Sequence, residues 1–325
     1  MARGETILRI KNLSVGYPRG RDRNALFENL DLALHRSEFV CFMGPNGIGK
    51  STLLRTLCGL HQPFAGSIEM DAIAPGQPLS HAISVVLTDR IEAMNMSAYE
   101  LVSFGRYPYV NWSISLGDRD RQIINDAIDK VHIRHLLHRK VFELSDGQRQ
   151  MVMIARALAQ DTPIMLLDEP TAHLDLNNRL EIMKLLRDLA HTLGKAIVVS
   201  THELDLALQT ADHVWLAGKD KGMVTGIPED LVLQGAFDDI FQFKGFDLRT
   251  GKVRHDATAG KIIAVTGEGY EYLWTKNALE RNGYHIAAEA AVRIQVQRRD
   301  NTLRWSIHDR DFHSIVDLLA YLRLS

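Results

Sequence analysis

Residues 44–51 of the chain are Gly44-Pro45-Asn46-Gly47-Ile48-Gly49-Lys50-Ser51, and Thr52 follows them. They match the pattern G-x-x-x-x-G-K-[ST] at every fixed position, between an apolar run at 39–43 and a helical pattern at 50–60. Glycines at this turn let backbone N–H groups surround a phosphate chain, with Lys50 reaching the β- and γ-phosphates and the Ser51 hydroxyl binding Mg²⁺. The stretch therefore predicts a phosphate-binding loop between a strand and a helix.

A second apolar run, Ile164–Leu167, ends in the two carboxylates Asp168 and Glu169. Because desolvating two charges is costly, carboxylates at the end of a buried strand indicate a chemical role. In a chain that also carries a phosphate loop, Asp168 is expected to hold Mg²⁺ through water. Glu169 is expected to polarise the attacking water as a general base.

The composition describes an ordinary globular protein. The 325 residues favour two domains, and 46% hydrophobic with 24% charged residues allow a sizeable core. With 38 Lys+Arg against 40 Asp+Glu, no global basic field indicates a nucleic-acid partner. Two cysteines predict a reducing compartment, and no apolar run approaches the roughly 18–20 residues that span a bilayer.

Strand-like runs alternate with helical patterns along the first part of the chain, which predicts a mostly parallel sheet wrapped by helices. The predicted strands are Ile7–Leu13, Leu30–Leu34, Phe39–Met43, Ile164–Leu167 and Ala196–Ser200. Between Met96 and Leu144 the apolar spacing becomes helical, so we expect a helical insertion there.

The composition shifts again after about Val253, and the remainder predicts a compact β-α-β-β-α unit. Gly267 and Gly269 lie between its first strand and helix, but Tyr272 occupies the third glycine position of a dinucleotide fingerprint, which excludes that motif. The predicted elements are Lys261–Val265, Gly269–Asn282, Val292–Gln297, Leu303–Ile307 and Phe312–Leu322.

The pentapeptide Leu144-Ser145-Asp146-Gly147-Gln148 precedes a predicted helix, Met151–Ala159. It resembles the signature sequence of ABC-type ATPases, and the family's other elements follow in order. Tyr17 resembles the aromatic residue that stacks on adenine, and Thr171–Asp175 resembles the loop that crosses to a partner subunit. His202 resembles the switch histidine that contacts the γ-phosphate. The resemblance covers about residues 5–250.

This resemblance implies a P-loop ABC-type nucleotide-binding domain with a mostly parallel sheet core, an antiparallel β subdomain and a helical subdomain, followed by a small C-terminal α+β domain. It also implies a homodimer that holds two ATP molecules head to tail. Ser145 and Gly147 begin a helix and form an anion site that caps the γ-phosphate bound by the other chain. The implied ATP-binding set is Tyr17, Gly44, Pro45, Asn46, Gly47, Ile48, Gly49, Lys50, Ser51, Thr52, Ser145, Gly147, Gln148 and Asp175.

Two positions depart from the family pattern. Asp146 replaces the first of two glycines in the signature, and because Asp tolerates unusual dihedral angles and Gly147 is kept, we expect function to survive. The strand 84–89 matches the one that ends in a metal-binding Gln, with Thr88 in the Gln position. The implied metal ligands are therefore Ser51, Asp168 and Thr88.

The stretch from Ala98 to Tyr109 is similar to importers of iron-siderophores, haem and cobalamin, as are Glu203–Leu208 and Gly226–Asp230. That branch implies a separate membrane permease dimer, fed by an extracytoplasmic substrate-binding protein. It also places the chain at the cytoplasmic face of the inner membrane as a peripheral subunit.

Taken together, the sequence predicts the ATP-hydrolysing subunit of an ABC importer, with Glu169 and His202 as catalytic residues and ATP with Mg²⁺ bound. We predict an ABC ATPase domain at 1–253, its helical subdomain at about 90–160, and a C-terminal extension at 254–325 without an assigned role. Three alternatives stay open: a non-transport ABC ATPase, an exporter subunit, and a subunit in which ATP binding alone is the switch.

Overall fold

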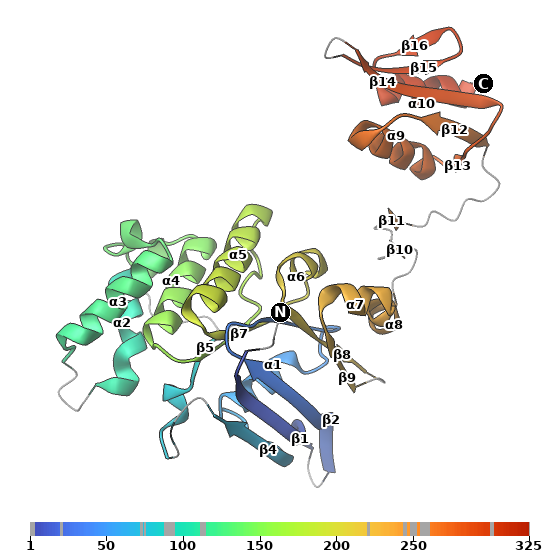
Figure 1. The fold of residues 1–325 in the computed structure, drawn as a ribbon. Helices are drawn as coiled ribbons and strands as arrows, with labels where there is room; N and C mark the ends of the chain where they lie inside the picture. The colour runs from blue at the N-terminus through green and yellow to red at the C-terminus, as the bar shows by residue number, and fades with distance from the viewer. Residues whose placement is uncertain are drawn as a thin grey trace. The chain divides into compact units, whose positions relative to one another are not determined.

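The computed structural model describes residues 4–19, 22–71, 74, 76–87, 95–110, 115–219, 222–242, 246–247, 252–253, 261–299 and 302–324 (Figure 1). The chain falls into two compact units, residues 1–242 and 243–325. Within the described ranges no helix is long and apolar enough to cross a membrane. The domain limits 1–253 and 254–325 stay a prediction.

A six-stranded sheet forms the centre of the first unit, in the order β5-β6-β7-β3-β8-β9. The first five strands are parallel and β9 is antiparallel to β8. Because helices flank a parallel sheet, its strands are continuous apolar runs, and every residue of β3, β6 and β7 is buried. The strands are β3 (Phe39–Met43), β5 (Ile83–Val86), β6 (Ile164–Asp168), β7 (Ala196–Ser200), β8 (His213–Gly218) and β9 (Gly222–Gly226).

An antiparallel sheet with the order β2-β1-β4 packs beside this core. Its strands are β1 (Thr6–Arg19), β2 (Asp22–His35) and β4 (Ala65–Met70). β1 and β2 are each 14 residues long, longer than the strands predicted at 7–13 and 30–34. Register shifts between Ile10 and Gly16 interrupt their alternation, which is why the pattern alone does not reveal their length.

The helices of the first unit include those predicted at 50–60, at 151–159 and within the insertion between Met96 and Leu144. Helix α4 begins at Asp146, five residues before the predicted start at Met151, because Ser145 and Gln148 form a capping box. The α-helices are α1 (Lys50–Leu57), α2 (Ala98–Ser103), α3 (Asp118–Lys130), α4 (Asp146–Ala159), α5 (Leu176–Leu193), α6 (Leu204–Thr210), α7 (Pro228–Leu233) and α8 (Ala236–Phe241). Short 3₁₀ helices are η1 (Leu79–His81), η2 (Phe104–Tyr109), η3 (Arg134–Leu136) and η4 (Val141–Glu143).

The second unit is a five-stranded sheet with the order β13-β12-β14-β15-β16 and two helices packed on its core. Strands β13 and β16 are additional to the predicted pattern, and the last helix begins at Ile315 instead of Phe312 because Phe312 pairs with Trp305 across β15 and β16. The elements are β10 (Phe246–Asp247), β11 (Lys252–Val253), β12 (Ile262–Thr266), α9 (Gly269–Arg281), β13 (His285–Ala287), β14 (Val292–Arg299), β15 (Thr302–Ile307), β16 (Arg310–Phe312) and α10 (Ile315–Leu324).

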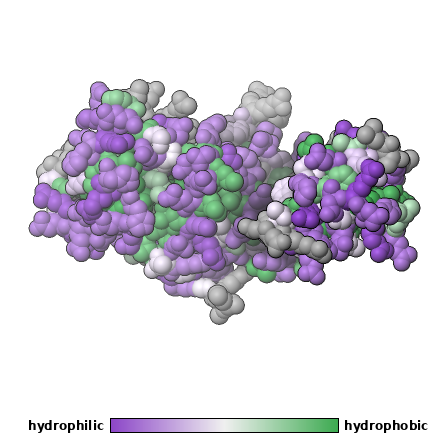
Figure 2. Space-filling model, turned by 90° about the horizontal axis from the view of Figure 1, so that it is seen from above, coloured by the Kyte–Doolittle hydropathy of each residue, from purple (hydrophilic) through white to green (hydrophobic). Residues whose placement is uncertain are grey.

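The predicted fold class is confirmed: a mostly parallel core, an antiparallel β subdomain, a helical subdomain and a small α+β unit are all present. Hydrophilic residues cover most of the visible surface, and hydrophobic atoms appear between them (Figure 2).

Candidate nucleotide site

The loop between β3 and α1 has the backbone that a phosphate cradle requires. Gly44, Gly47 and Gly49 all have positive φ angles, of 155°, 76° and 112°. A Cβ atom added at Gly44 would lie 2.7 Å from the Ala217 carbonyl oxygen, so only glycine fits there. The loop thus opens directly onto the first turn of α1, where free N–H groups and the helix dipole favour an anion.

Lys50 is folded back across this loop. Its side chain is buried, and its ammonium donates hydrogen bonds to the carbonyl oxygens of Gly44 at 3.0 Å and Pro45 at 3.5 Å. Burial lowers the pKa of Lys50, while the nearby Glu169 and Asp168 charges oppose that shift. These carbonyl oxygens and the two nearby carboxylates stabilise the buried ammonium. The negative charge of a polyphosphate would stabilise it in the same way.

Asp168 and Glu169 end β6 next to β7. Asp168 is buried, and the Ser200 hydroxyl donates a hydrogen bond of 2.6 Å to its carboxylate. Glu169 has φ 46°, and its N–H bonds both the carbonyl and hydroxyl oxygens of Ser200 at 3.1 and 3.0 Å. These bonds hold Glu169 in the left-handed region, and its side chain lines the cavity with the phosphate loop.

His202 and Glu169 meet in one cavity with the phosphate loop. The imidazole Nδ1 lies 3.8 Å from the Glu169 carboxylate. The cavity has a volume of about 560 Å³, within the usual range of about 300–1,000 Å³ for small-molecule sites. Its lining residues are Tyr17, Asn24, Leu26, Asn46, Gly47, Gly49, Lys50, Ser51, Thr52, Glu169 and His202.

Tyr17 forms one wall of this cavity, and its position depends on the long β-hairpin. Its hydroxyl lies 2.8 Å from the Thr52 hydroxyl on α1, and its ring meets His61 edge to face at 4.9 Å. Asn24, which the sequence analysis missed, pairs with Tyr17 across β1 and β2. The only signal for Asn24 in the sequence is that it follows the expected hairpin turn. Which residue it faces depends on the register of β1 and β2, and the bulges set that register.

The signature residues do not line this cavity. Ser145 caps the N-terminus of α4, and its hydroxyl accepts a hydrogen bond of 3.3 Å from the Gln148 N–H. Gly147 packs against Asn178, whose N–H and carboxamide both bond Asp175, the N-cap of α5, at 2.9 and 2.7 Å. The starts of α4 and α5 therefore lie side by side.

Asp146, which departs from the family signature, forms an ion pair with Arg149 one turn later on α4. The pair places a guanidinium beside the carboxylate, so Asp146 does not add an uncompensated negative charge to the start of α4. This is a physical reason why the substitution is compatible with an anion site. The other departure, Thr88, lies outside the described residues.

The far end of α4 is anchored by Arg106, from the stretch 98–109. Arg106 is buried and pairs with Asp120 of α3 at 2.9 Å. It also donates a hydrogen bond of 3.1 Å to the carbonyl of Ala159 at the C-terminus of α4 and lies 4.1 Å from the centre of the Tyr109 ring. One cation thus joins three elements of the helical subdomain and satisfies a helix-end carbonyl.

The residues present fit a magnesium ion held together with a nucleotide. Ser51 is exposed at the start of α1, and Asp168 is fixed at the end of β6. Over the described ranges no three His, Cys, Asp or Glu residues gather into a metal site. Mg²⁺ suits a site of this kind, because it takes one or two protein oxygens together with substrate phosphates and water.

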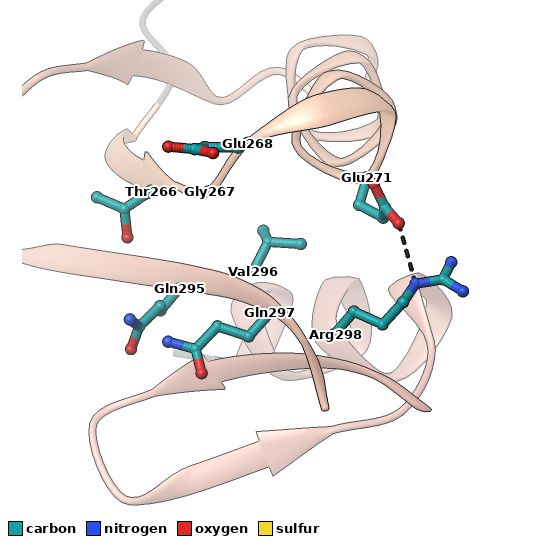
Figure 3. A pocket seen from close by; sticks show the side chains of 8 residues that line it. All are labelled: Thr266, Gly267, Glu268, Glu271, Gln295, Val296, Gln297 and Arg298. Atoms are coloured by element: carbon teal, nitrogen blue, oxygen red, sulfur yellow. Dashed lines mark hydrogen bonds and ion pairs between the residues drawn. The ribbon is translucent and has the colours of Figure 1, made fainter. Parts of the chain in front are cut away.

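A further cavity of about 450 Å³ lies in the second unit, at the end of β12 and beside β14 (Figure 3). Arg298 is paired with Glu271 at 3.1 Å there, while the carboxylate of Glu268 lies apart from that pair. The Arg298 charge is thereby already compensated within the unit, so we assign no ligand to this cavity.

The fold and the site together define a P-loop nucleotide-binding protein. The family model for the ABC transporter matches residues 27–172, and that for the iron ABC transporter C-terminal domain matches residues 259–323. An uncharacterised ABC transporter ATP-binding protein of Methanocaldococcus jannaschii is 35% identical over 277 residues, covering 81% of this chain and 92% of its own length. The chain belongs to the family of ABC transporter ATP-binding proteins, and it is an ATPase.

Two further similarities bear on function. The ferric enterobactin transport ATP-binding protein FepC of Escherichia coli is 34% identical over 242 residues, covering 72% of this chain and 86% of its own. The ATP-binding cassette MJ0796, solved as a dimer in a post-hydrolysis state with ADP and Pi, is 28% identical with a TM-score of 0.57. That similarity covers 68% of this chain and 99% of the cassette. The predicted resemblance to ATPases of the iron-siderophore importer branch is thereby confirmed.

Proposed function

We propose that two copies of this chain bind two MgATP molecules between them and use hydrolysis to drive import through a separate permease dimer. The observation that carries this proposal is the division of the site. The cavity unites the phosphate loop, Glu169 and His202, whereas Ser145 and Gly147 are not among the residues that line it. A second chain in the reverse orientation supplies the missing half.

Within this proposal each residue other than Thr88 acts from the position described above. The loop N–H groups and Lys50 bind the phosphates, and Tyr17 supports the adenine ring. Ser51 and Asp168 would hold Mg²⁺, with Thr88 as the third ligand, and the ion would neutralise phosphate charge. Glu169 accepts a hydrogen bond from the attacking water and takes its proton. His202, beside that carboxylate, positions the γ-phosphate.

The second half of the site acts on the same phosphate from the opposite side. The start of α4 at Ser145, Gly147 and Gln148 presents N–H groups to the γ-phosphate bound by the other chain. Asp175 at the start of α5 lies at the same interface. Because closure requires the γ-phosphate, hydrolysis would release the two chains, and that opening is the motion a permease would follow.

The comparisons favour a metal chelate as the cargo, either an iron chelate or a corrinoid. FepC is named for ferric enterobactin transport, and the matched C-terminal family is that of iron ABC transporters. We therefore assign the chain to uptake of an iron-siderophore, haem or cobalamin type cargo. An extracytoplasmic binding protein delivers that cargo, and this chain works as a peripheral subunit at the cytoplasmic face of the inner membrane.

The dimer is tested with Glu169→Gln, which keeps the shape of the carboxylate but removes the base. With saturating MgATP we expect this variant to elute as a dimer from a sizing column, whereas Glu181→Gln, an exposed change on α5, stays at the wild-type position. A Glu169→Gln chain that remains monomeric would contradict the two-chain site.

The transport role is tested by purifying the tagged chain from its native membranes in mild detergent. Recovery of a polytopic permease with a binding protein supports import. Recovery of a permease without any binding protein favours an exporter, and recovery of neither favours a non-transport ATPase. Either of the last two results overturns the import proposal while leaving the ATPase assignment intact.

A further inference from the structure

Helix α9 of the second unit exposes a row of large apolar side chains. Tyr270 and Trp274 are each 65% exposed, and Leu273 is 44% exposed. Their spacing of three and four residues places them on one face of the 13-residue helix. Asn277 and Arg281 continue the same face toward the C-terminus. We call Tyr270, Leu273, Trp274, Asn277 and Arg281 the α9 stripe.

The fold of the second unit does not use this stripe. The opposite face of α9 packs on the core through Thr275, Ala278 and Leu279, which are buried. The Thr275 hydroxyl accepts a hydrogen bond of 2.7 Å from the indole of Trp305. Because these buried residues already hold the helix on the core, the exposed apolar side chains of the stripe contribute little to the stability of the second unit. Exposed apolar rows of this kind mark interaction surfaces.

The charge on the stripe shows which orientation of two such helices is favourable. Arg281 is exposed at the C-terminal end and forms no ion pair within the described residues, and Tyr270 lies at the other end. If two copies of α9 pack antiparallel, Arg281 of each copy meets the Tyr270 ring of the other, a favourable cation–π contact. The two helix dipoles then also run antiparallel, which is a favourable arrangement. A parallel pair would instead bring the two Arg281 guanidinium groups together.

We propose that the α9 stripe is covered by the α9 stripe of a second copy of this chain, as a second contact of the ATP-bound dimer. This inference rests on the proposed function, because the two-chain ATP site is what brings two tethered C-terminal units together. The three apolar side chains expose about 400 Å² per copy, roughly half of what a stable free interface buries on each partner. The contact is therefore weak alone and becomes significant when the ATPase units raise its effective concentration.

The test uses the full chain in the Glu169→Gln background, so that ATP-driven dimers accumulate. Leu273→Glu/Trp274→Glu places two carboxylates in the stripe, and Val316→Glu is the matched control because Val316 is 74% exposed on α10 of the same unit. We measure by light scattering the ATP concentration at half-maximal dimer. The stripe variant is expected to need at least about tenfold more ATP, and the control is expected to need the same as its parent.

Each outcome has one interpretation. If the stripe variant dimerises at the parent's ATP concentration, the α9 contact is refuted while the two-chain ATP site stands. If it dimerises normally but no longer recovers a permease from membranes, the stripe binds that partner and the self-contact is likewise refuted. If Glu169→Gln itself forms no dimer with ATP, the proposed function fails first. Circular dichroism of the stripe variant checks the fold, which exposed positions leave intact.

Discussion

The buried ion pair between Arg106 and Asp120 predicts a loss of stability whose size follows from the structure. The Arg106 side chain is 6% exposed and that of its partner Asp120 is 19% exposed. Arg106→Met keeps the unbranched apolar stem of the side chain but leaves the Asp120 carboxylate unpaired and the Ala159 carbonyl without its charged donor. Removing one partner of a buried ion pair costs about 3–5 kcal/mol, and the partial exposure of Asp120 favours the lower value. About 3 kcal/mol corresponds to roughly a 100-fold change in a local opening equilibrium.

Hydrogen exchange measured by mass spectrometry resolves this effect along the chain. Peptides from α2, α3 and α4 are expected to exchange about 100-fold faster in Arg106→Met, whereas peptides from β3 and β7 change far less. The matched control is Arg134→Met, which breaks the pair with Asp129 in the same subdomain, where both side chains are more than half exposed. An exposed pair contributes at most about 1 kcal/mol, so the control is expected to change less than about fivefold.

A second substitution isolates the buried charge. In Arg106→Met/Asp120→Asn the carboxamide still accepts the Gly117 N–H bond of 3.1 Å but carries no charge, so most of the lost protection is expected to return. Equal, small effects of Arg106→Met and Arg134→Met would refute the reasoning. So would a double variant as labile as Arg106→Met alone.

The same pair predicts a pH dependence. Burial raises the pKa of the Asp120 carboxyl, but hydrogen bonds from Arg106 and the Gly117 N–H, with the Arg106 and Arg119 charges, bring it below its ordinary value. A carboxyl with a lowered pKa in the folded state stabilises it above the unfolded pKa of about 3.9. This stabilisation is lost as the pH falls through the folded pKa, so the protection difference between wild type and Arg106→Met is expected to shrink below about pH 4.

Substitutions at three further positions test the nucleotide site. Gly44→Ala forces a Cβ against the Ala217 carbonyl and is expected to weaken ATP binding at least tenfold by calorimetry, because such backbone strain costs about 1–3 kcal/mol. Tyr17→Ala is expected to raise the KM for ATP about tenfold and Tyr17→Phe only slightly, since the ring contributes about 1–3 kcal/mol by stacking on a base; equal effects would contradict the stacking role. Ser200→Ala removes the hydrogen bond to Asp168, and we expect half-maximal ATPase activity to require about tenfold more Mg²⁺.

Two strands of the second unit that the sequence analysis missed are too short to show a pattern. Strands β13 and β16 have three residues each, too short for an alternating pattern. They form because neighbouring strands in the sheet pair with them. The full length of β1 and β2 was hidden for a different reason: bulges shift the side-chain alternation, so the pattern ends before the strands do.

The sequence by itself determined the phosphate loop, the carboxylate pair after β6 and the core strands. Each is encoded in contiguous residues, where glycine dihedral angles or an uninterrupted apolar run decide the local conformation. Only the tertiary structure decided that Asn24 joins Tyr17 in the cavity, that Asn178 links Gly147 to Asp175, and that Arg106 anchors the end of α4. Those contacts join residues from separate elements, and their geometry depends on how sheets and helices pack, which no local pattern specifies. The absence of Ser145 from the cavity lining is of the same kind, because it depends on how the helical subdomain packs beside the sheet.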